Sequence, residues 1–373
     1  MIATRRNRAL AVRERDRLRL FPSAWHKTLL VALVIVFIAT PLQLDDSWLE
    51  VLARCGVAAI GAIGLNLLTG YTGQASLGHA AFLGVGTYTA AWFGVQQELP
   101  FVVWLPLCAV LGGLAGAVIG PFALRLRGNY LAIVTLGLLY VAQYVFVNWD
   151  SLTGGSSGTR TAAPVEILGL DFDDLQIGAE SFTRRQGLVW LIWAVVFVVA
   201  ILAKNIVRTR PGRAMQAVRD RDVAAEVIGV SLARYKISAF ARASALAAVA
   251  GGLYGVVNRQ VSPDAFGGVE GLLLSIQYVA MIIVGGLGTI GGSIVGAVVV
   301  SGLPQVITRI STNTDLPFVQ GDAGGSSGIL DVFVLNQFLF GFLIVAFLLF
   351  EPRGLAGVWL RIRRYFQGWP FSY

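Results

Sequence analysis

A short polar run, TGYTGQASLGHA, interrupts an otherwise apolar part of the chain at residues 69–80. Its Thr, Gln, Ser and His side chains can hydrogen-bond a polar solute, which needs such partners because an unpaired polar group in an apolar environment is costly. The same side chains can instead satisfy the backbone groups of an unwound segment. Both interpretations predict a break between two membrane helices. The candidate solute-contacting residues are Asn66, Thr69, Gln74, Ser76 and His79.

The second candidate site is the charged block RTRPGRAMQAVRDRDVAAEVIGVSLARYK at residues 208–236. Hydrocarbon does not hold so many Arg and Lys side chains, so the block must lie outside the bilayer while the apolar helices on either side hold it near the surface. Pro211 favours a helix start and Gly229 a helix stop, which predicts one helix from about Gly212 to Gly229. A soluble partner that docks on this helix could move the attached membrane helices.

Within the predicted helix, Met215, Val218 and Ala225 recur at helical spacings and predict a small apolar patch on one face. A short amphipathic helix that fits a groove of another protein is a common recognition mode. The alternative is a solvated helix that only anchors the loop at the membrane surface. Charged side chains surround the predicted patch, namely Arg213, Arg219, Arg221 and Asp222.

No catalytic motif accompanies these two regions. The sequence contains no GxxxxGK[ST] phosphate-binding loop, no HExxH pair and no CxxC pair, and none of its lysines follows a glycine. Cys55 and Cys108 fall within apolar runs and are expected to be packed side chains. We therefore expect neither a metal site nor a cofactor on this chain, and any ATP that drives it must be hydrolysed on another subunit.

The composition places the chain in a membrane, because 56% of its residues are hydrophobic and only 13% are charged, with a mean hydropathy of +0.71. Soluble domains carry about 25% charged residues. Apolar runs near 20 residues long predict an all-α polytopic fold with about ten transmembrane helices over residues 28–350. A basic segment, 1–27, precedes this domain and a tail, 351–373, follows it. The predicted spans are 28–44, 48–68, 80–97, 101–122, 130–148, 187–206, 237–257, 270–287, 290–308 and 332–350.

Most of the 29 Arg and Lys residues fall in segments that the alternating spans place on one side of the membrane. The positive-inside rule then predicts that both termini and the block at 208–236 are cytoplasmic. This distribution explains the net charge of +8 without nucleic acid as a partner. Residues 8–21 fit either a membrane-surface helix or a disordered basic tail, and we expect no signal-peptide cleavage.

The distribution of glycine also carries information about the membrane helices, because many of the 44 glycines concentrate at residues 64–86, 112–120 and 285–296. Small residues let membrane helices approach closely, which is the expected role of most of these glycines. A helix break that faces protein or a water-filled path is the alternative.

Charged residues within the predicted spans are few. Glu50 and Glu270 both lie near outer ends, whereas proton- or sodium-coupled carriers place acidic residues near the bilayer centre. Arg54 follows Glu50 by four residues, which predicts an ion pair on one helix face. Arg242 is close enough to the cytoplasmic boundary to extend its side chain there. A stand-alone transporter or channel is the competing class, and a membrane-embedded enzyme would need a catalytic constellation that the sequence lacks.

The run GLNLLTGYTGQASLGHAAFLGVGTYTAA at residues 64–91 resembles the signature of permease subunits of branched-chain amino acid ABC importers, specifically the LivM type. Three further runs resemble other parts of that family: PGRAMQAVRDRDVAAEVIGVSLARYK from Pro211, VGGLGTIGGSIVGA from Val284 and LFEPRGLAG from Leu349. Together the motifs span most of residues 50–357. The parts that vary are the basic N-terminus, the segment near 150–186 and the insert near 311–331. The segments 148–186 and 315–331 are either contacts for an extracytoplasmic binding protein or tolerated insertions.

The resemblance implies a heteromeric importer in a bacterial cytoplasmic (inner) membrane. Its expected parts are this permease, a second homologous permease, two cytoplasmic ATPase subunits that bind ATP and Mg²⁺, and an extracytoplasmic solute-binding protein. Relatives carry leucine, isoleucine and valine, and others carry urea, short amides or aromatic acids. The loop lacks the trailing I-x-L-P of the common ABC-permease pattern. Residues expected to couple to the ATPases are Gly212, Arg213, Met215, Val218, Arg219, Arg221, Ala225, Glu226 and Gly229.

Overall fold

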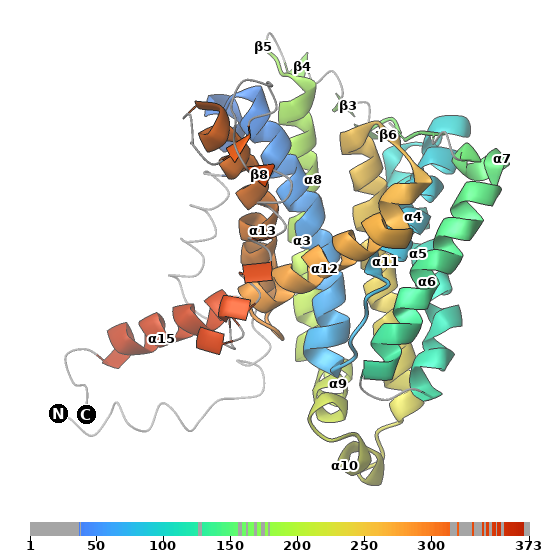
Figure 1. The fold of residues 1–373 in the computed structure, drawn as a ribbon, viewed down its shortest axis with the longest axis vertical. Coiled ribbons are helices and arrows are strands. Elements are labelled where there is room, and N and C mark those ends of the chain that lie inside the picture. Colours follow the sequence, from blue (N-terminus) through green and yellow to red (C-terminus); the bar gives the residue numbers. More distant parts are fainter. Residues whose placement is uncertain are drawn as a thin grey trace. The chain divides into compact units, whose positions relative to one another are not determined.

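In a computed structural model the chain divides after Asp45, and residues 46–373 form one compact unit (Figure 1). Residues 46–373 contain the helical bundle that carries both candidate sites. The predicted basic segment 1–27 and most of the predicted spans 28–44 and 332–350 lie outside the described residues. The structure describes residues 37, 39–125, 129–155, 159–161, 163–167, 170–172, 176–177, 180–313, 319–320, 330–331, 338, 341–342, 345–347, 349–351 and 354–368.

Six of the described helices are long and apolar enough to cross a membrane, judged by length and composition. At 1.5 Å per residue, even the shortest of them nearly matches the roughly 30 Å hydrocarbon core. Each coincides with a predicted span, which confirms the helical class and those spans as helices. The six are α3 (Asp46–Thr72), α5 (Phe101–Arg125), α6 (Asn129–Asn148), α8 (Arg184–Arg208), α11 (Leu232–Asn258) and α12 (Gly268–Gly285).

Two further predicted spans contain shorter or interrupted helices. The span predicted at 80–97 consists of α4 (His79–Ala90) followed by the π-helix η2 (Ala91–Gln96). The span predicted at 290–308 is α13 (Ile290–Asn313), which contains Pro304. The total of ten spans stays a prediction. Other helices whose bounds the structure describes are α7 (Asp150–Thr153), α9 (Arg210–Asp220), α10 (Asp222–Val227), the 3-10 helix η4 (Pro263–Phe266) and α15 (Gly354–Gly368).

Short two-residue strands occur only in the connections between the described helices. Three pairs are antiparallel and one, β7 with β8, is parallel. Such short ladders fix loops and do not add a sheet layer to the helical fold. The pairs are β1 (Thr159–Arg160) with β6 (Gln260–Val261), β2 (Glu166–Ile167) with β3 (Leu170–Asp171), β4 (Gln176–Ile177) with β5 (Glu180–Ser181), and β7 (Val319–Gln320) with β8 (Leu330–Asp331).

Helix α11 packs against α5, α3 and α4, and small residues bring these helices close together. A Cβ atom at Gly112 on α5 would clash with the Ala248 side chain, and one at Gly86 on α4 would clash with the Ala248 carbonyl. A Cβ atom at Gly251 on α11 would likewise clash with the Leu83 backbone. The predicted packing role of glycine is therefore confirmed at these positions.

The long helices define two ends of the bundle. Helices α3 and α8 begin together, because Arg185 at the start of α8 pairs with Asp46 and Glu50 at the start of α3. At the other end α8 leads into α9, and α11 begins after α10. We call the end that carries α9 and α10 the α9 end, and the end where α3 and α8 begin the far end.

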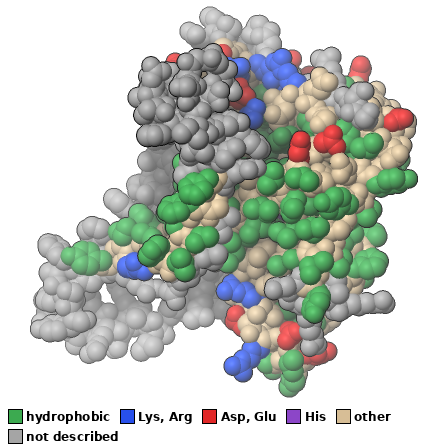
Figure 2. Space-filling view, viewed as in Figure 1, with side chains coloured by type: hydrophobic (Ala, Val, Ile, Leu, Met, Phe, Trp, Pro, Cys, Tyr) green, Lys and Arg blue, Asp and Glu red, His purple; other side chains and the backbone are tan. Residues whose placement is uncertain are grey.

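Apolar side chains cover much of the outer surface between these ends. Figure 2 shows a band of hydrophobic side chains across the visible face, with charged side chains above and below it. Val118 on α5 and Tyr144 on α6 are each 70% exposed. A continuous apolar surface of this kind is expected where a helix faces lipid or another membrane subunit. Helix α15 also exposes Trp359 and Tyr365, and its first residue, Gly354, packs on the end of α12.

Candidate functional site

The polar run at residues 69–80 does break the membrane helix, as the sequence predicted. Helix α3 ends at Thr72 and α4 begins at His79, with non-helical backbone between them. Gly73 has a φ of +71°, a conformation that favours glycine, and its N–H donates to the Thr69 carbonyl at 3.1 Å. The Gln74 N–H donates to the Leu68 carbonyl at 3.3 Å. The Gly73 bond, from the residue after the helix to the carbonyl four positions earlier, is that of the αL motif that ends many helices.

Asn66 joins the end of α3 to the turn between α12 and α13. Its Nδ2 donates to the Thr289 carbonyl at 2.9 Å and to Ser293 Oγ at 2.6 Å. Its Oδ1 accepts a hydrogen bond from the Gly288 N–H at 2.9 Å. Asn66 is buried, so these three bonds satisfy an amide that would otherwise be costly to place there. The side chain therefore connects protein segments and offers little to a solute.

Arg219 joins the same place to the charged block. From the last turn of α9, its Nη1 donates to the Gly70 carbonyl at 2.5 Å. The last carbonyls of a helix lack partners within the helix, and the negative end of the helix dipole favours a cation there. Gly73 and Gly288 make room for the arginine, since a Cβ at either would lie 3.3 or 3.1 Å from its side-chain atoms. One arginine thus links the charged block, the end of α3 and the α12–α13 turn.

The other predicted solute contacts differ in what they bind. Thr69 Oγ1 donates to the Gln74 carbonyl at 3.0 Å, so it supports the break itself. His79 is buried, lies 3.0 Å from the Gly61 carbonyl through Nε2, and packs edge-on against Tyr278 with ring centroids 5.0 Å apart. These contacts are those of structural residues.

Gln74 and Ser76 are also buried beside the break. Neither side-chain atom of Gln74 has a hydrogen-bond partner among the described residues. A buried amide without partners is costly, so Gln74 is the member of the predicted set whose polar atoms remain open to another group. The contact of these residues with a solute stays a prediction.

The charged block folds as two helices, so the prediction of one helix from Gly212 to Gly229 was wrong. Helix α9 ends at Asp220, Arg221 has extended backbone (φ −155°, ψ 103°), and α10 runs to Val227. The predicted boundaries hold, because Pro211 lies in the first turn and Gly229 has a φ of +87° after the second helix. Residue types alone do not reveal the extended step at Arg221, since Arg is a good helix former.

The predicted apolar patch faces the protein itself. Met215, Val218 and Ala225 are buried, and α9 packs against α8, α3 and α11. Their amphipathic spacing is the same for a helix that packs inward and for one that docks on a partner, so the sequence could not separate these cases. Gly212 lies against the Val207 backbone, where a Cβ would clash, and permits the tight turn from α8 into α9.

The outer surface of the block has a different composition. Arg213, Arg221 and Glu226 are exposed, as expected for residues that could meet a partner. Exposed apolar side chains that the sequence analysis missed lie beside them, namely Val223 and Val227 on α10 and Ile228 directly after it. A cavity of about 450 Å³ adjoins this surface between α10 and the start of α11, with Asp222, Glu226 and Lys236 in its lining. Exposed apolar groups ringed by charges are typical of a protein interface.

Arg242, predicted to reach the cytoplasmic boundary, lies beside the buried side of the block. Its Nη1 is 3.8 Å from the Met215 sulfur. This contact places the guanidinium beside the buried face of α9, so the side chain extends toward the α9 end.

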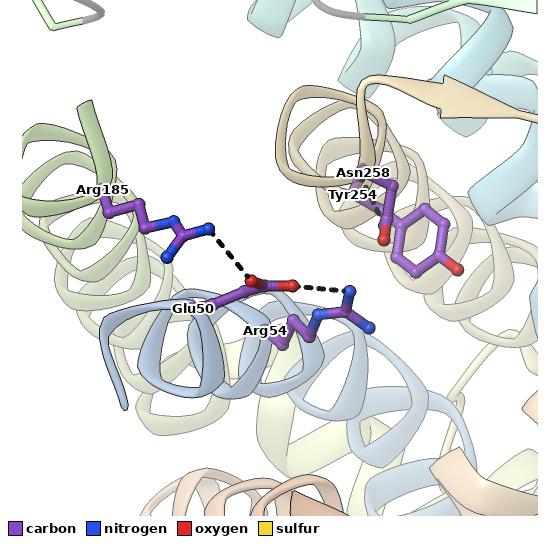
Figure 3. A network of polar contacts seen from close by, with 5 residues as sticks. All are labelled: Glu50, Arg54, Arg185, Tyr254 and Asn258. Atoms are coloured by element: carbon purple, nitrogen blue, oxygen red, sulfur yellow. Dashed lines mark hydrogen bonds and ion pairs between the residues drawn. The ribbon is translucent and has the colours of Figure 1, made fainter. Parts of the chain in front are cut away.

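The far end carries a second group of charges (Figure 3). Glu50 accepts a hydrogen bond from Arg54 at 2.8 Å, which confirms the predicted ion pair, and its other oxygen lies 3.8 Å from Arg185. Arg185 also lies 3.4 Å from Asp46. Tyr254 and Asn258 occupy the facing turn of α11. A cavity of about 470 Å³ adjoins this cluster, and sequence analysis missed it because its lining comes from three segments far apart in the chain.

Comparisons with known proteins agree with the motifs. A family profile described as the permease component of branched-chain amino acid transport systems matches residues 47–349. The chain is 30% identical to the high-affinity branched-chain amino acid transport system permease protein LivM of Escherichia coli K12, over 70% of this chain and 64% of that protein. LivM of Salmonella typhimurium LT2 is also 30% identical, over 73% of this chain and 66% of that protein. The chain thus spans just under two thirds of both relatives.

A more distant relative is the ribose import permease protein RbsC of Haemophilus influenzae, which is 23% identical over 77% of this chain and 86% of that protein. No solved structure matches the protein. The family match includes the break after α3, the charged block and the far-end cluster apart from Asp46, and its members are transport components and not enzymes. The apolar helices and this match together make the protein a multi-pass membrane protein that belongs to the family of branched-chain amino acid transport permeases.

Proposed function

We propose that this chain is a transmembrane permease subunit of an ABC importer in a bacterial cytoplasmic (inner) membrane. Its partners are a second homologous permease, two cytoplasmic ATPase subunits that hold ATP and Mg²⁺, and an extracytoplasmic solute-binding protein. The α9 end faces the cytoplasm and the far end faces outward. The charged block supports this assignment because its Arg and Lys content is typical of a cytoplasmic face.

The observation that carries the proposal is the hydrogen bond from Arg219 to the Gly70 carbonyl. It ties a helix outside the bilayer to the point where a membrane helix is broken. A partner that moves α9 therefore acts on the end of α3, and through Asn66 on the turn between α12 and α13. In the proposed mechanism, closure of the ATPases displaces α9 and α10, and the attached helices alternate between outward- and inward-open arrangements.

The proposed solutes are leucine, isoleucine and valine, supported by the family match and the two LivM relatives. The same machinery could instead carry urea, short amides or aromatic acids. Competition for uptake distinguishes these solutes: vesicles that contain the complete importer should take up labelled leucine, and unlabelled isoleucine and valine should compete while urea does not. Competition by urea alone would contradict the proposed solute class.

A stand-alone secondary transporter is the other class of function. The described spanning helices place Asp46, Glu50 and Glu270 near their ends and contain no acidic residue at mid-length, where coupling ions usually bind. Affinity purification from gently solubilised membranes tests the two classes. The importer subunit should copurify with a second permease and an ATPase, and purification as a lone, transport-active chain would reject the importer.

A further inference from the structure

The cavity at the far end combines features that a binding site for a small zwitterion requires. It lies among the start of α3, the start of α8 and the end of α11 with Arg259 directly after it, and has a volume of about 470 Å³. Small-molecule sites commonly occupy about 300–1,000 Å³. All three helices run from this cavity to the α9 end, so a ligand held here touches the same helices that the charged block joins.

Charges of both signs line the cavity. Asp46 and Glu50 supply carboxylates from α3, and Arg184, Arg185 and Arg259 supply guanidinium groups. A ligand with one ammonium and one carboxylate group can meet both signs at once, whereas a neutral solute such as urea cannot use either charge fully. The lining therefore favours a zwitterion.

The ion pairs in this cluster are weak enough to be exchanged. Arg185 lies 3.4 Å from Asp46 and 3.8 Å from Glu50, and the three side chains are between 41% and 61% exposed. Exposed pairs at such distances contribute little to stability, so a ligand can replace them at small cost. The tighter 2.8 Å pair from Arg54 to Glu50 holds the carboxylate in position on α3.

Arg259 is the free cation of the cavity. Among the described residues, its guanidinium has no hydrogen bond or ion pair, although it lines the cavity. Its backbone is held in an unusual conformation with a φ of +63°, fixed by its N–H bond to the Gly255 carbonyl at 2.9 Å and by the Thr161 N–H, which donates to its carbonyl at 2.7 Å. Such a φ costs free energy in a non-glycine residue, so these two bonds are needed to hold it.

The remaining lining is aliphatic. Leu49, Ala53, Leu188 and Val257 border the cavity, and the first three are buried. Such a surface accepts a hydrocarbon side chain next to the charged groups. The cavity thus combines a carboxylate, an unpaired guanidinium and an apolar wall. These complement the ammonium group, the carboxylate and the side chain of an aliphatic amino acid.

We propose that this far-end cavity is a receiving site that binds a zwitterionic aliphatic amino acid before it enters the translocation path. The ligand carboxylate meets Arg259, the ammonium group meets Glu50, and the side chain lies on the Leu49 and Leu188 surface. The inference rests on the proposed function, because it assumes that solute approaches from the far end. It adds a site on the permease itself, separate from the soluble binding protein.

Equilibrium binding of labelled leucine to the complete permease–ATPase complex in nanodiscs tests the site, without binding protein or ATP. Arg259→Gly removes the guanidinium and eases the backbone, since glycine adopts a positive φ without strain. Glu50→Gln removes the acid. Each variant should weaken leucine binding by about tenfold, as expected for loss of one charge-assisted bond. Glu98→Gln is the matched control, because Glu98 is exposed and outside the cavity, and it should bind leucine like the wild type.

Two leucine analogues assign the roles. Leucinamide lacks the carboxylate, so it should displace labelled leucine poorly from the wild type. From Arg259→Gly it should displace labelled leucine as well as unlabelled leucine does. 4-Methylpentanoate lacks the ammonium group, so it should displace labelled leucine poorly from the wild type and as well as unlabelled leucine does from Glu50→Gln. Leucine binding that is unchanged in both variants overturns the site. Retained leucine binding with weaker association of the binding protein would also overturn it, because the cluster would then be a protein-docking surface.

Uptake by the complete importer with its binding protein separates this proposal from the proposed function. If ATP-driven leucine uptake is present but the wild-type complex without binding protein shows no saturable leucine binding, the receiving site is wrong and the importer stands. If the complete importer shows no ATP-driven uptake of any solute, the proposed function itself fails, and the receiving site, which rests on it, fails as well.

Discussion

Arg219 is the residue whose contacts distinguish a mechanical role from simple solvation. Arg213, Arg219 and Arg221 are all exposed, but Arg219 Nη1 also donates to the Gly70 carbonyl across an element boundary. Among the described residues, Arg219 is the arginine of the block that hydrogen-bonds the broken end of α3. The sequence analysis grouped these arginines as equivalent, because their charge and spacing do not show which one bonds α3.

Replacement of Arg219 should uncouple ATP hydrolysis from transport. In the reconstituted importer, Arg219→Gln should lower solute uptake per ATP hydrolysed by about tenfold, since a bond between a cation and a carbonyl at the helix end is lost. Arg219→Lys should restore part of the ratio because it keeps a donor and the charge. Paired measurements of uptake and phosphate release give the ratio.

The control for this prediction is Arg210→Gln, on the first turn of the same helix, where the arginine is exposed. This variant should keep the wild-type ratio. If Arg219→Gln lowers uptake and ATP hydrolysis in equal proportion, Arg219 serves docking or folding and does not transmit movement.

At the scale of elements, the contact between α5 and α11 depends on glycine. A Cβ at Gly112 would clash with the Ala248 side chain, while a Cβ at Gly137 on α6 would meet nothing within 4 Å. Gly112→Ala should lower the unfolding temperature of the purified protein, since overpacking costs about 1–3 kcal/mol. Gly137→Ala should leave it unchanged or raise it slightly, because alanine favours the helix. Equal effects of the two substitutions would contradict the packing described for α5 and α11.

The sequence predicts an element well when the element depends on a local pattern of residues, and poorly when it depends on tertiary packing. Spans between residues 48 and 308 were found because apolar length is a strong signal, and the break at Gly73 because polar residues and glycine interrupt it. The step at Arg221 and the inward orientation of Met215 depend on tertiary packing that no local pattern records. The far-end cavity was missed because Glu50, Arg185 and Arg259 are brought together only by the fold.

At the scale of the whole molecule, the proposed function requires the two ends of the bundle to face opposite sides of the membrane. Single cysteines at Thr183 and Val227 test this, because both positions are exposed and lie at the far end and the α9 end. The native Cys55 and Cys108 are buried and should contribute little background. A membrane-impermeant thiol reagent added to intact spheroplasts should label Thr183→Cys at once, and Val227→Cys only after permeabilisation. Labelling of Val227→Cys in intact cells would reverse the assigned orientation.

The central claim is that this chain moves solute only when partner ATPases act on its α9 end. Accumulation of labelled leucine in proteoliposomes, with binding protein outside and ATP enclosed, tests it most directly. Vesicles with the complete importer should concentrate leucine well above the external level. In vesicles that hold this chain alone, or the importer without ATP, the internal leucine concentration should not exceed the external one. Concentrative uptake by the chain alone would contradict the account.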